Sequence, residues 1–410
     1  MSRACINSEI GALEAVIVHT PGEELRGVTP ANREAYLYSD IVDLTLAQAE
    51  HRQFIDVLQR CATVYSVEQL LTDVLAIPEA RSFLQETTTN LVPAESLAVG
   101  LSPLSAEQMV RTLIEGARLE RGPVAKALNG FGFAFPPLPN LFFPRDAGII
   151  IGEYALVGAM RYDVRWTEEL LIKALLLYHP DLGNRGVIYD GSREKRDHYT
   201  LEGGDIHRLR EDVILVGLSD RTSPAAIDML CELVFAHGLA TDVLVVVMPG
   251  APTAIHLDMV FSQVDTDLCV VFPPFFIGPE RRTVLHRRKG TDSVREVPNF
   301  FAGLKDLDLD LQPILAGGDN RSTQEREQWS SACNFLALRP GVIVGYGRNR
   351  GTLRQLEAAG FQVRTAEEYL AQSEASTLAQ RAVITLSGSE LVRGGGGPRC
   401  MTLPIRRAAV

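Results

Sequence analysis

Short apolar runs alternate with amphipathic stretches of helical period along most of the chain. An apolar run at 15–19 precedes a helical pattern at 42–60, and a second apolar run follows at 61–66. Strands joined by helices in this way are typical of an α/β fold. The segment 28–32, Val-Thr-Pro-Ala-Asn, also predicts a helix start, because proline suits the first helical turn.

From residue 147 onward, a strand-strand-helix-strand unit recurs. The two clearest copies have their strands and helices at 148–151, 154–157 and 167–178, and then at 206–209, 213–217, 223–237 and 242–247. Two further copies have theirs at 255–261 and 268–271, and then at 314–316, 341–346, 351–359 and 362–365. A period of roughly 50–70 residues favours a parallel or mixed sheet closed around an axis, with an ordinary doubly wound sheet as the alternative.

Residues 68–130 interrupt this pattern. They contain helical patterns at 70–75, 78–85 and 106–119 and almost no strand signal. We therefore predict a helical insertion over 68–130 within one α/β domain that spans residues 1–410.

The composition is that of a globular protein with a large core. Of the 410 residues, 46% are hydrophobic and 22% are charged, and the formal net charge is −11. This acidity argues against nucleic acid or an anionic membrane as partner and suits a cationic small molecule slightly better. Neither a long apolar span nor the apolar region of a signal peptide is apparent, so a cytoplasmic location is expected.

Cys400 differs from the other cysteines because it follows a glycine run, Gly394 to Gly397. Glycines allow a tight turn and the close approach of a substrate. Paired Cys/His spacing is lacking, so neither a zinc site nor any other bound metal is expected. Most of the remaining five cysteines lie in or beside apolar segments, and all five are interpreted as reduced packing residues: Cys5, Cys61, Cys231, Cys269 and Cys333.

Two acidic clusters could supply partners for this thiol. Glu202 and Asp205 flank two glycines, which permit a bend that aims both carboxylates inward; a solvated turn is the simpler alternative. On a predicted strand, His256 and Asp258 share one face, and burying them together requires that they be paired. A satisfied structural histidine is about equally compatible with that segment.

A third cluster follows a proline run at 136–139. Arg145 and Asp146 could form no more than a surface ion pair in a loop, which contributes little stability. Arg161, Arg165 and Arg221 lie near the ends of predicted elements, and each taken alone reads as a solvated arginine.

Taken in this order, the motifs resemble those of the arginine deiminase family, within the guanidine-modifying (pentein) superfamily. The matching segments cover nearly the whole chain: 28–32, 143–146, 160–162, 202–205, 219–223, 256–258, 317–319 and 400–404. The resemblance implies a five-bladed α/β propeller of repeated ββαβ units around a pseudo-five-fold axis, with a helical insertion. It also implies hydrolysis of L-arginine to L-citrulline and ammonia without a cofactor, by a homo-oligomer.

The resemblance further implies a role for each site residue. Cys400 resembles the nucleophile, His256 the general acid/base and Glu202 the acid that orients the histidine. Asp146 and Asp258 resemble the carboxylates that hold the guanidinium group. The positions that resemble contacts to the rest of the substrate are Asn140, Arg165 and Arg221 for its α-carboxylate, Phe143 and Leu37 for its side chain, and Gly394 in the glycine loop.

Three segments depart from the family pattern. Pro144 replaces a threonine, Gly395 replaces an arginine of the glycine loop, and Ala332-Cys333-Asn334 replaces Gly-Asn-Asn. None of these changes removes a reacting group. An amidinotransferase acting on arginine would share the covalent intermediate, and a non-catalytic arginine-binding propeller is the remaining alternative.

Overall fold

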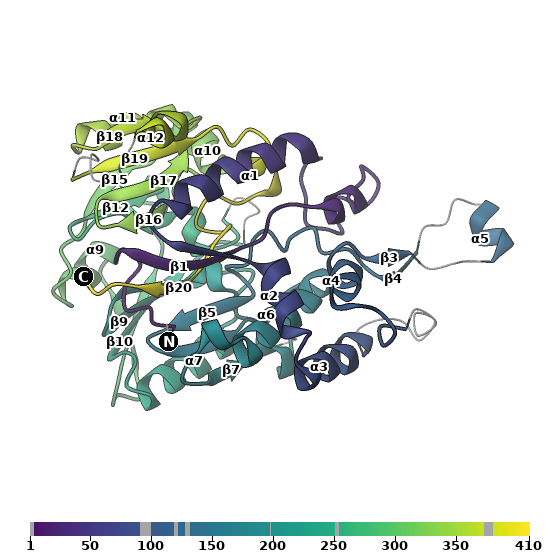
Figure 1. Cartoon of the computed structure of the whole chain (residues 1–410). Coiled ribbons are helices and arrows are strands. Elements are labelled where there is room, and N and C mark those ends of the chain that lie inside the picture. Colours follow the sequence, from purple (N-terminus) through teal and green to yellow (C-terminus); the bar gives the residue numbers. More distant parts are fainter. Residues whose placement is uncertain are drawn as a thin grey trace.

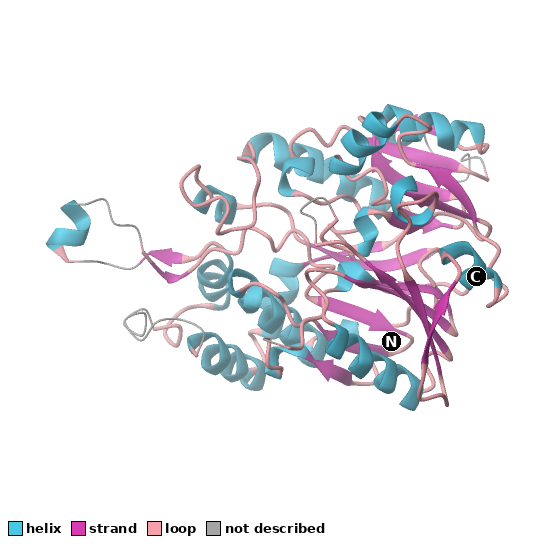
Figure 2. Cartoon of the chain, turned by 180° about the vertical axis from the view of Figure 1, so that it is seen from behind, coloured by secondary structure: helices cyan, strands magenta, loops and turns pink. Residues whose placement is uncertain are grey.

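Five sheets of the structure repeat one pairing pattern, in which an antiparallel pair of strands is extended by a parallel strand (Figures 1 and 2). The computed structural model describes residues 4–90, 100–118, 122–127, 132–196, 198–250, 254–372 and 380–410. Among these residues, no helix combines the length and the apolar character needed to cross a membrane. The α/β fold predicted from the sequence is therefore present.

Within each of the five sheets, neighbouring strands are joined by hydrogen bonds. In spatial order, the sheets consist of β2 (Thr63–Ser66), β1 (Leu13–Val18) and β20 (Leu403–Arg407); β5 (Gly148–Ile151), β6 (Tyr154–Val157) and β7 (Val187–Asp190); β14 (Val294–Val297), β13 (Val284–Arg288), β10 (Asp242–Val247), β9 (Val213–Leu218) and β8 (Ile206–Arg210); β11 (Phe261–Gln263), β12 (Leu268–Val271) and β15 (Gln312–Leu315); and β16 (Leu336–Arg339), β17 (Val342–Tyr346), β19 (Ala382–Leu386) and β18 (Gln362–Thr365).

Helices connect the strands of these sheets. Local signals fix their starts: the Asp43 carboxylate accepts from the backbone N–H of Leu46, and the Ser223 hydroxyl accepts from that of Ala226 ahead of a proline. The connecting helices are α1 (Leu44–Gln59), α6 (Trp166–Tyr178), α7 (Pro224–Ala236), α8 (Pro273–Phe276), α9 (Phe300–Lys305), α10 (Arg321–Trp329), α11 (Arg350–Ala358) and α12 (Ala366–Ala371).

The segment predicted as an insertion is mainly helical where it is described. Helices α2 and α3 pack on α6, and a small β3–β4 hairpin extends away from the body of the protein with α5 at its tip (Figure 1). The elements are α2 (Val67–Val74), α3 (Pro78–Thr89), α4 (Ala106–Ile114), β3 (Ala117–Arg118), α5 (Pro123–Ala127) and β4 (Phe133–Phe135).

The segment predicted as a strand over 255–261 is instead bent. Leu257–Met259 form a 3-10 turn, and β11 begins only at Phe261. The Asp205 carboxylate accepts from the backbone N–H of Leu257 at 2.8 Å, so a side chain takes the place of a strand partner.

Two other expectations are wrong. Residues 28–32 form turns, because the Asn32 side chain accepts from the N–H of Thr29 and donates to the carbonyl of Gly27, and Leu37 (φ 66°) ends the segment in the left-handed region. The strand near 314–316 pairs with β12 and therefore completes the third repeat of the sequence rather than opening the fourth.

One apolar cluster carries the C-terminal segment that contains the predicted nucleophile. Cys400 and Met401 are packed with Phe142 and Phe143 against side chains of β1, α1, β17 and β19. Elements from both ends of the chain therefore support the same site.

Candidate active site

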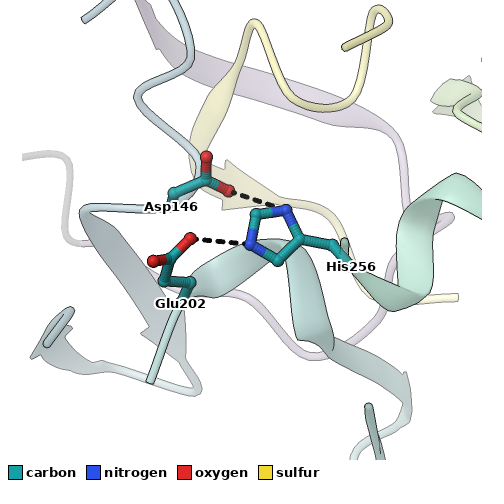
Figure 3. Close-up of side chains that lie close together, drawn as sticks. All are labelled: Asp146, Glu202 and His256. Atoms are coloured by element: carbon teal, nitrogen blue, oxygen red, sulfur yellow. Dashed lines mark hydrogen bonds and ion pairs between the residues drawn. The ribbon is translucent and has the colours of Figure 1, made fainter. Parts of the chain in front are cut away.

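The His256 side chain lies between two carboxylates (Figure 3). Its Nε2 is 2.7 Å from Glu202 Oε2, and its Nδ1 is 3.7 Å from Asp146 Oδ1. All three side chains are almost completely buried. Because each carboxylate faces a different ring nitrogen, the orientation of the imidazole is fixed.

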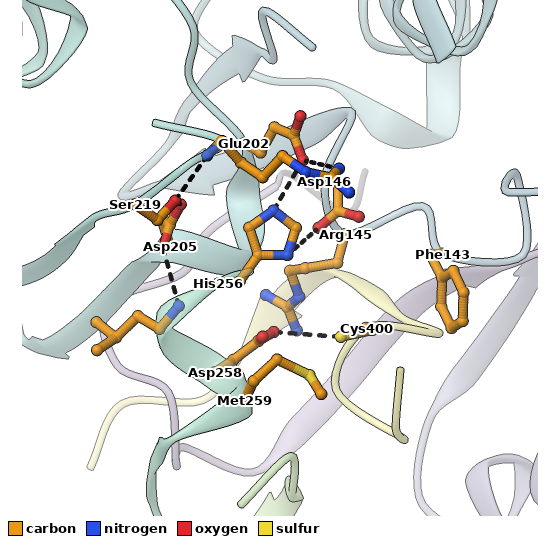
Figure 4. A network of polar contacts seen from close by, with 12 residues as sticks. Phe143, Arg145, Asp146, Glu202, Asp205, Ser219, His256, Asp258, Met259 and Cys400 are labelled. Carbon is orange, nitrogen blue, oxygen red and sulfur yellow. Dashed lines mark hydrogen bonds and ion pairs between the residues drawn. The ribbon is translucent and has the colours of Figure 1, made fainter. Parts of the chain in front are cut away.

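Two adjacent glycines bring Glu202 to this position. A Cβ on Gly203 would lie 2.0 Å from the carbonyl oxygen of Arg145, and one on Gly204 would lie 2.6 Å from His256 Cγ. Only residues without a side chain permit both approaches. The next residue, Asp205, accepts from Leu257 N–H and Ser219 Oγ, which ties the acidic loop to the histidine loop (Figure 4).

The charges around His256 favour its protonated form. Burial lowers the pKa of His256, but the Asp146 charge, the Glu202 hydrogen bond and the Asp205 charge outweigh it and raise that pKa to about 9. Burial likewise raises the pKa of Glu202, but the Arg221 charge and the His256 hydrogen bond bring it down to about 2. At neutral pH, an imidazolium therefore faces carboxylates.

The thiol lies on the other side of Asp258 and Arg145 from the imidazole (Figure 4). Cys400 Sγ is 3.4 Å from Asp258 Oδ2 and 3.0 Å from Asn334 Nδ2. Burial, followed by the Asp258 and Asp146 charges, raises the pKa of Cys400 well above its ordinary value, against smaller opposing effects of the Gly397 backbone and Arg399. The resting sulfur is therefore a thiol.

Each of the two predicted guanidinium-binding carboxylates already holds an arginine of the chain. Arg165 Nη1 donates to Asp146 Oδ2 at 2.6 Å, and Arg399 Nη1 donates to Asp258 Oδ2 at 2.8 Å. Both arginines are buried, and each has a second acidic partner: Glu168 binds Arg165, and Glu9 binds Arg399. The two aspartates are thus arranged to bind planar cations.

The residues predicted to contact the rest of the substrate lie around this centre. Arg221 Nη1 is 3.1 Å from Glu202 Oε2, and its guanidinium lies over the Tyr162 ring, 4.7 Å from the ring centroid. Asn140 Nδ2 donates to the carbonyl of Tyr36, next to Leu37, which is half-buried. Neither Arg165 nor Arg221 is a solvated arginine.

The predicted aromatic contact is tightly packed. Phe143 stacks on Phe142 with ring centroids 3.9 Å apart. A Cβ on Gly394 would lie 2.5 Å from Phe142 Cζ and 3.1 Å from Phe143 Cζ, so glycine is needed for this loop to close over the rings.

The Arg145–Asp146 ion pair considered from the sequence is absent. Arg145 is buried and donates from its Nε to the carbonyl of Arg399, while Asp146 pairs with Arg165. The loop is therefore part of the interior rather than a solvated turn, and the same is true of the segment that carries Glu202 and Asp205.

Comparison with known sequences identifies the family. The sequence model of the arginine deiminase family matches residues 34–407. The chain belongs to the arginine deiminase family. An arginine deiminase of Rhodococcus jostii (strain RHA1) is 32% identical to it over 418 residues, which cover 98% of this chain and 96% of the relative.

Solved structures share the α/β pentein fold of the family at low sequence identity. SxtG, an amidinotransferase of saxitoxin biosynthesis from Microseira wollei, has a TM-score of 0.56 and 15% identity, covering 99% of this chain and 98% of the other. The inosamine-phosphate amidinotransferase StrB1 of Streptomyces griseus has a TM-score of 0.54 and 17% identity, covering 100% and 98%. At these identities, the likeness concerns the fold alone.

Three side chains of this family member contact the site although the sequence did not single them out for it. Asn334 contacts the sulfur, Arg399 holds Asp258, and Glu168 holds Arg165. Glu168 could have been suspected, because it lies three residues after Arg165 at a helix start, where such pairs meet. The other two contacts join segments 66 and 141 residues apart and leave no local signal.

The site can also be compared with a metal centre. Ligand atoms of Asp146, Glu202 and His256 lie within 4.8 Å of one another, a spacing that a metal ion could use. A histidine must be neutral to bind a metal, whereas the surrounding charges raise the pKa of His256 to about 9. The donor set therefore fits a proton better than a metal ion.

Proposed function

We propose that this protein is an arginine deiminase that hydrolyses L-arginine to L-citrulline and ammonia, with Cys400 as its nucleophile. Membership of the family supports the reaction. The observation that carries the assignment of residues is that Asp146 and Asp258, on either side of the reacting groups, each bind a guanidinium group in the structure.

In the binding step, the substrate guanidinium replaces Arg165 on Asp146 and Arg399 on Asp258. Two carboxylates match the planar donor fork of a guanidinium, so the central carbon is held in front of the sulfur. Arg165, once released, is available with Arg221 and Asn140 for the substrate α-carboxylate. Phe143, Leu37 and Gly394 enclose the aliphatic part of the substrate.

In the first chemical step, the substrate cation favours loss of the Cys400 proton, and the thiolate attacks the guanidinium carbon. A carbon–sulfur bond forms and gives a tetrahedral adduct. Its carbon–nitrogen bond breaks as His256 donates a proton to the departing nitrogen, which leaves as ammonia. The product is an amidino-thioether on Cys400, and Glu202 holds the imidazole in place.

In the second step, His256 takes a proton from water, and the water oxygen bonds to the same carbon. The carbon–sulfur bond then breaks, the electron pair returns to Cys400, and citrulline is released. All atoms come from arginine and one water molecule, so the chain's own side chains supply every proton transfer that the reaction needs.

The proposal extends to the architecture. We infer that the repeated ββαβ units are five blades around a pseudo-five-fold axis, with residues 68–130 inserted into one catalytic domain over 1–410. The same strand pairing in five sheets supports this arrangement, as does the pairing of β20 with β1, which joins the two ends of the chain. The homo-oligomer stays a prediction, which light scattering on the purified protein can test.

The decisive experiment is mass spectrometry of the protein quenched during turnover of arginine. We expect an amidino adduct on the peptide that contains Cys400, together with stoichiometric citrulline and ammonia. Adding glycine tests the amidinotransferase alternative, since ornithine release without citrulline would contradict the hydrolase assignment. Arginine binding without any adduct or product would favour the non-catalytic alternative.

A further inference from the structure

Asn334 is a completely buried side chain that contacts the reacting sulfur directly. Its Nδ2 lies 3.0 Å from Cys400 Sγ and also 3.2 Å from the carbonyl oxygen of Asp258. It follows α10 and precedes β16, so its segment is separate from those that supply the predicted catalytic residues.

The orientation of the Asn334 amide follows from its other contacts. Its Oδ1 accepts from the backbone N–H groups of Arg399 at 3.0 Å and of Cys400 at 3.1 Å. Because that oxygen accepts two N–H groups, the NH₂ group must be the end that faces the sulfur. The side chain therefore holds the Cys400 backbone and directs a donor to Sγ.

The glycine run allows this approach. A Cβ on Gly397 would lie 2.8 Å from Asn334 Cβ and 2.9 Å from its Oδ1. Gly397 also provides a backbone hydrogen bond that lowers the pKa of Cys400. The glycine thus serves the contact between Asn334 and the sulfur, and not only the turn of the loop.

A donor at this point opposes the charges that surround the sulfur. Asp258 and Asp146 act against a thiolate, Arg399 acts in its favour, and the Tyr346 hydroxyl is engaged with the carbonyl of Gly396. When Arg399 leaves Asp258 for a substrate, as the proposed function requires, Asn334 and the Gly397 N–H stay beside Sγ. These neutral donors then stabilise negative charge in a site that excludes water.

Resting on that proposed function, we propose that Asn334 is a catalytic residue that donates a hydrogen bond to the Cys400 thiolate. The bond strengthens as the proton leaves the thiol, before the carbon–sulfur bond forms. It acts again when that bond breaks and its electron pair returns to the sulfur. The contact therefore assists both halves of the reaction.

The test is the pH dependence of Cys400 alkylation by iodoacetamide without arginine, followed on its own peptide because other cysteines also react. Asn334→Ala removes the donor, and Asn334→Asp keeps acceptors for the two backbone N–H groups but replaces the donor by a charge. We expect the alkylation curve to shift to higher pH in both variants, and further in Asn334→Asp. The kcat for arginine should fall by about 10²-fold in Asn334→Ala.

Asn349→Ala is the matched control. Asn349 is also a buried asparagine, and its Nδ2 donates to the carbonyl of Ser330 at 2.9 Å rather than to the sulfur. We expect this variant to lose thermal stability while it keeps the wild-type alkylation curve. Should Asn334→Ala fail to fold, Asn334→Asp carries the test, because its clamp on the backbone is retained.

An unshifted alkylation curve in a folded Asn334 variant would overturn the inference, whatever its rate with arginine. A shifted curve in a protein that never deiminates arginine would instead support the sulfur contact and refute the proposed function. The two ideas can therefore fail separately.

Discussion

The imidazole and the sulfur are equally buried and both lie beside carboxylates, but their surroundings have opposite consequences. Near His256, the acids raise the pKa to about 9, so the ring carries the proton that a leaving nitrogen needs. Near Cys400, burial and the acids raise the pKa of the thiol as well, so the sulfur is held in its unreactive form. One side of the site is ready before substrate arrives, and the other is not.

This difference assigns the activation of the nucleophile to the substrate. A guanidinium cation between Asp146 and Asp258 compensates the charges that keep Cys400 protonated. Uncharged analogues would leave those charges in place. The site thus discriminates by charge at the chemical step as well as at binding, and the following experiments separate its two sides.

Removing the sulfur should have the largest effect. Cys400→Ala is expected to lower ammonia release by roughly 10⁴-fold or more, because no covalent intermediate can form. Calorimetry should still detect arginine binding, since both aspartates remain. Cys231→Ala, which alters a buried thiol of α7, is the control and should keep nearly full activity. Wild-type turnover in Cys400→Ala would refute the mechanism.

Displacing the imidazole alone should have the next largest effect. A Cβ on Gly204 would lie 2.6 Å from His256 Cγ, so Gly204→Ala must shift the ring, and we expect kcat to fall by about 10²-fold. Iodoacetamide should alkylate Cys400 as in the wild type. In the control, Gly183→Ala, the added Cβ meets only an ordinary contact at 3.5 Å. Full activity in Gly204→Ala would show that the ring position is unimportant.

A smaller and more selective effect is expected at the predicted carboxylate site. Arg221→Ala should raise KM for arginine about 10- to 100-fold, the cost of a charged hydrogen bond, and leave KM for agmatine unchanged. Because Arg221 also contacts Glu202, kcat should decrease similarly for both substrates. Equal increases of KM for the two substrates would exclude a carboxylate role.

The smallest effect concerns pH and stability. The folded-state pKa of His256, about 9, exceeds its ordinary value of 6.5, so its contribution is complete below about pH 6.5 and is lost as pH rises through 9. Urea unfolding should therefore show declining stability between pH 7 and 9. His256→Asn should flatten this decline, and His237→Asn, at the C-terminal end of α7, should not. A decline unchanged in His256→Asn would argue against a raised pKa.

Local signals account for most of the predicted elements. Strands β5, β6, β12 and β18 have the predicted limits, because short runs between turn signals leave little freedom. The turn at Leu257–Met259 was missed because the Asp205 carboxylate that bends it lies 52 residues away. Long-range hydrogen bonds of side chains are invisible to periodicity.

The site shows the same division. The motifs predicted that Asp146, Glu202, His256, Asp258 and Cys400 belong together, and the structure places them in one cluster, while their catalytic roles stay predictions. The sequence could not indicate that Arg165 and Arg399 would hold the aspartates, because unlike charges choose partners only after folding. Nor could it reveal that Asn334 reaches the sulfur.

The pairing of β20 with β1 has a consequence for biosynthesis. Ribosomes deliver the strand after Cys400 only when almost every other segment has already emerged, and that strand must then find its partner near the start of the polypeptide. Nascent chains therefore lack an assembled nucleophile throughout elongation. The enzyme should switch on abruptly at completion of this last contact, and truncation by a few residues in β20 should leave a protein that is largely folded yet inert.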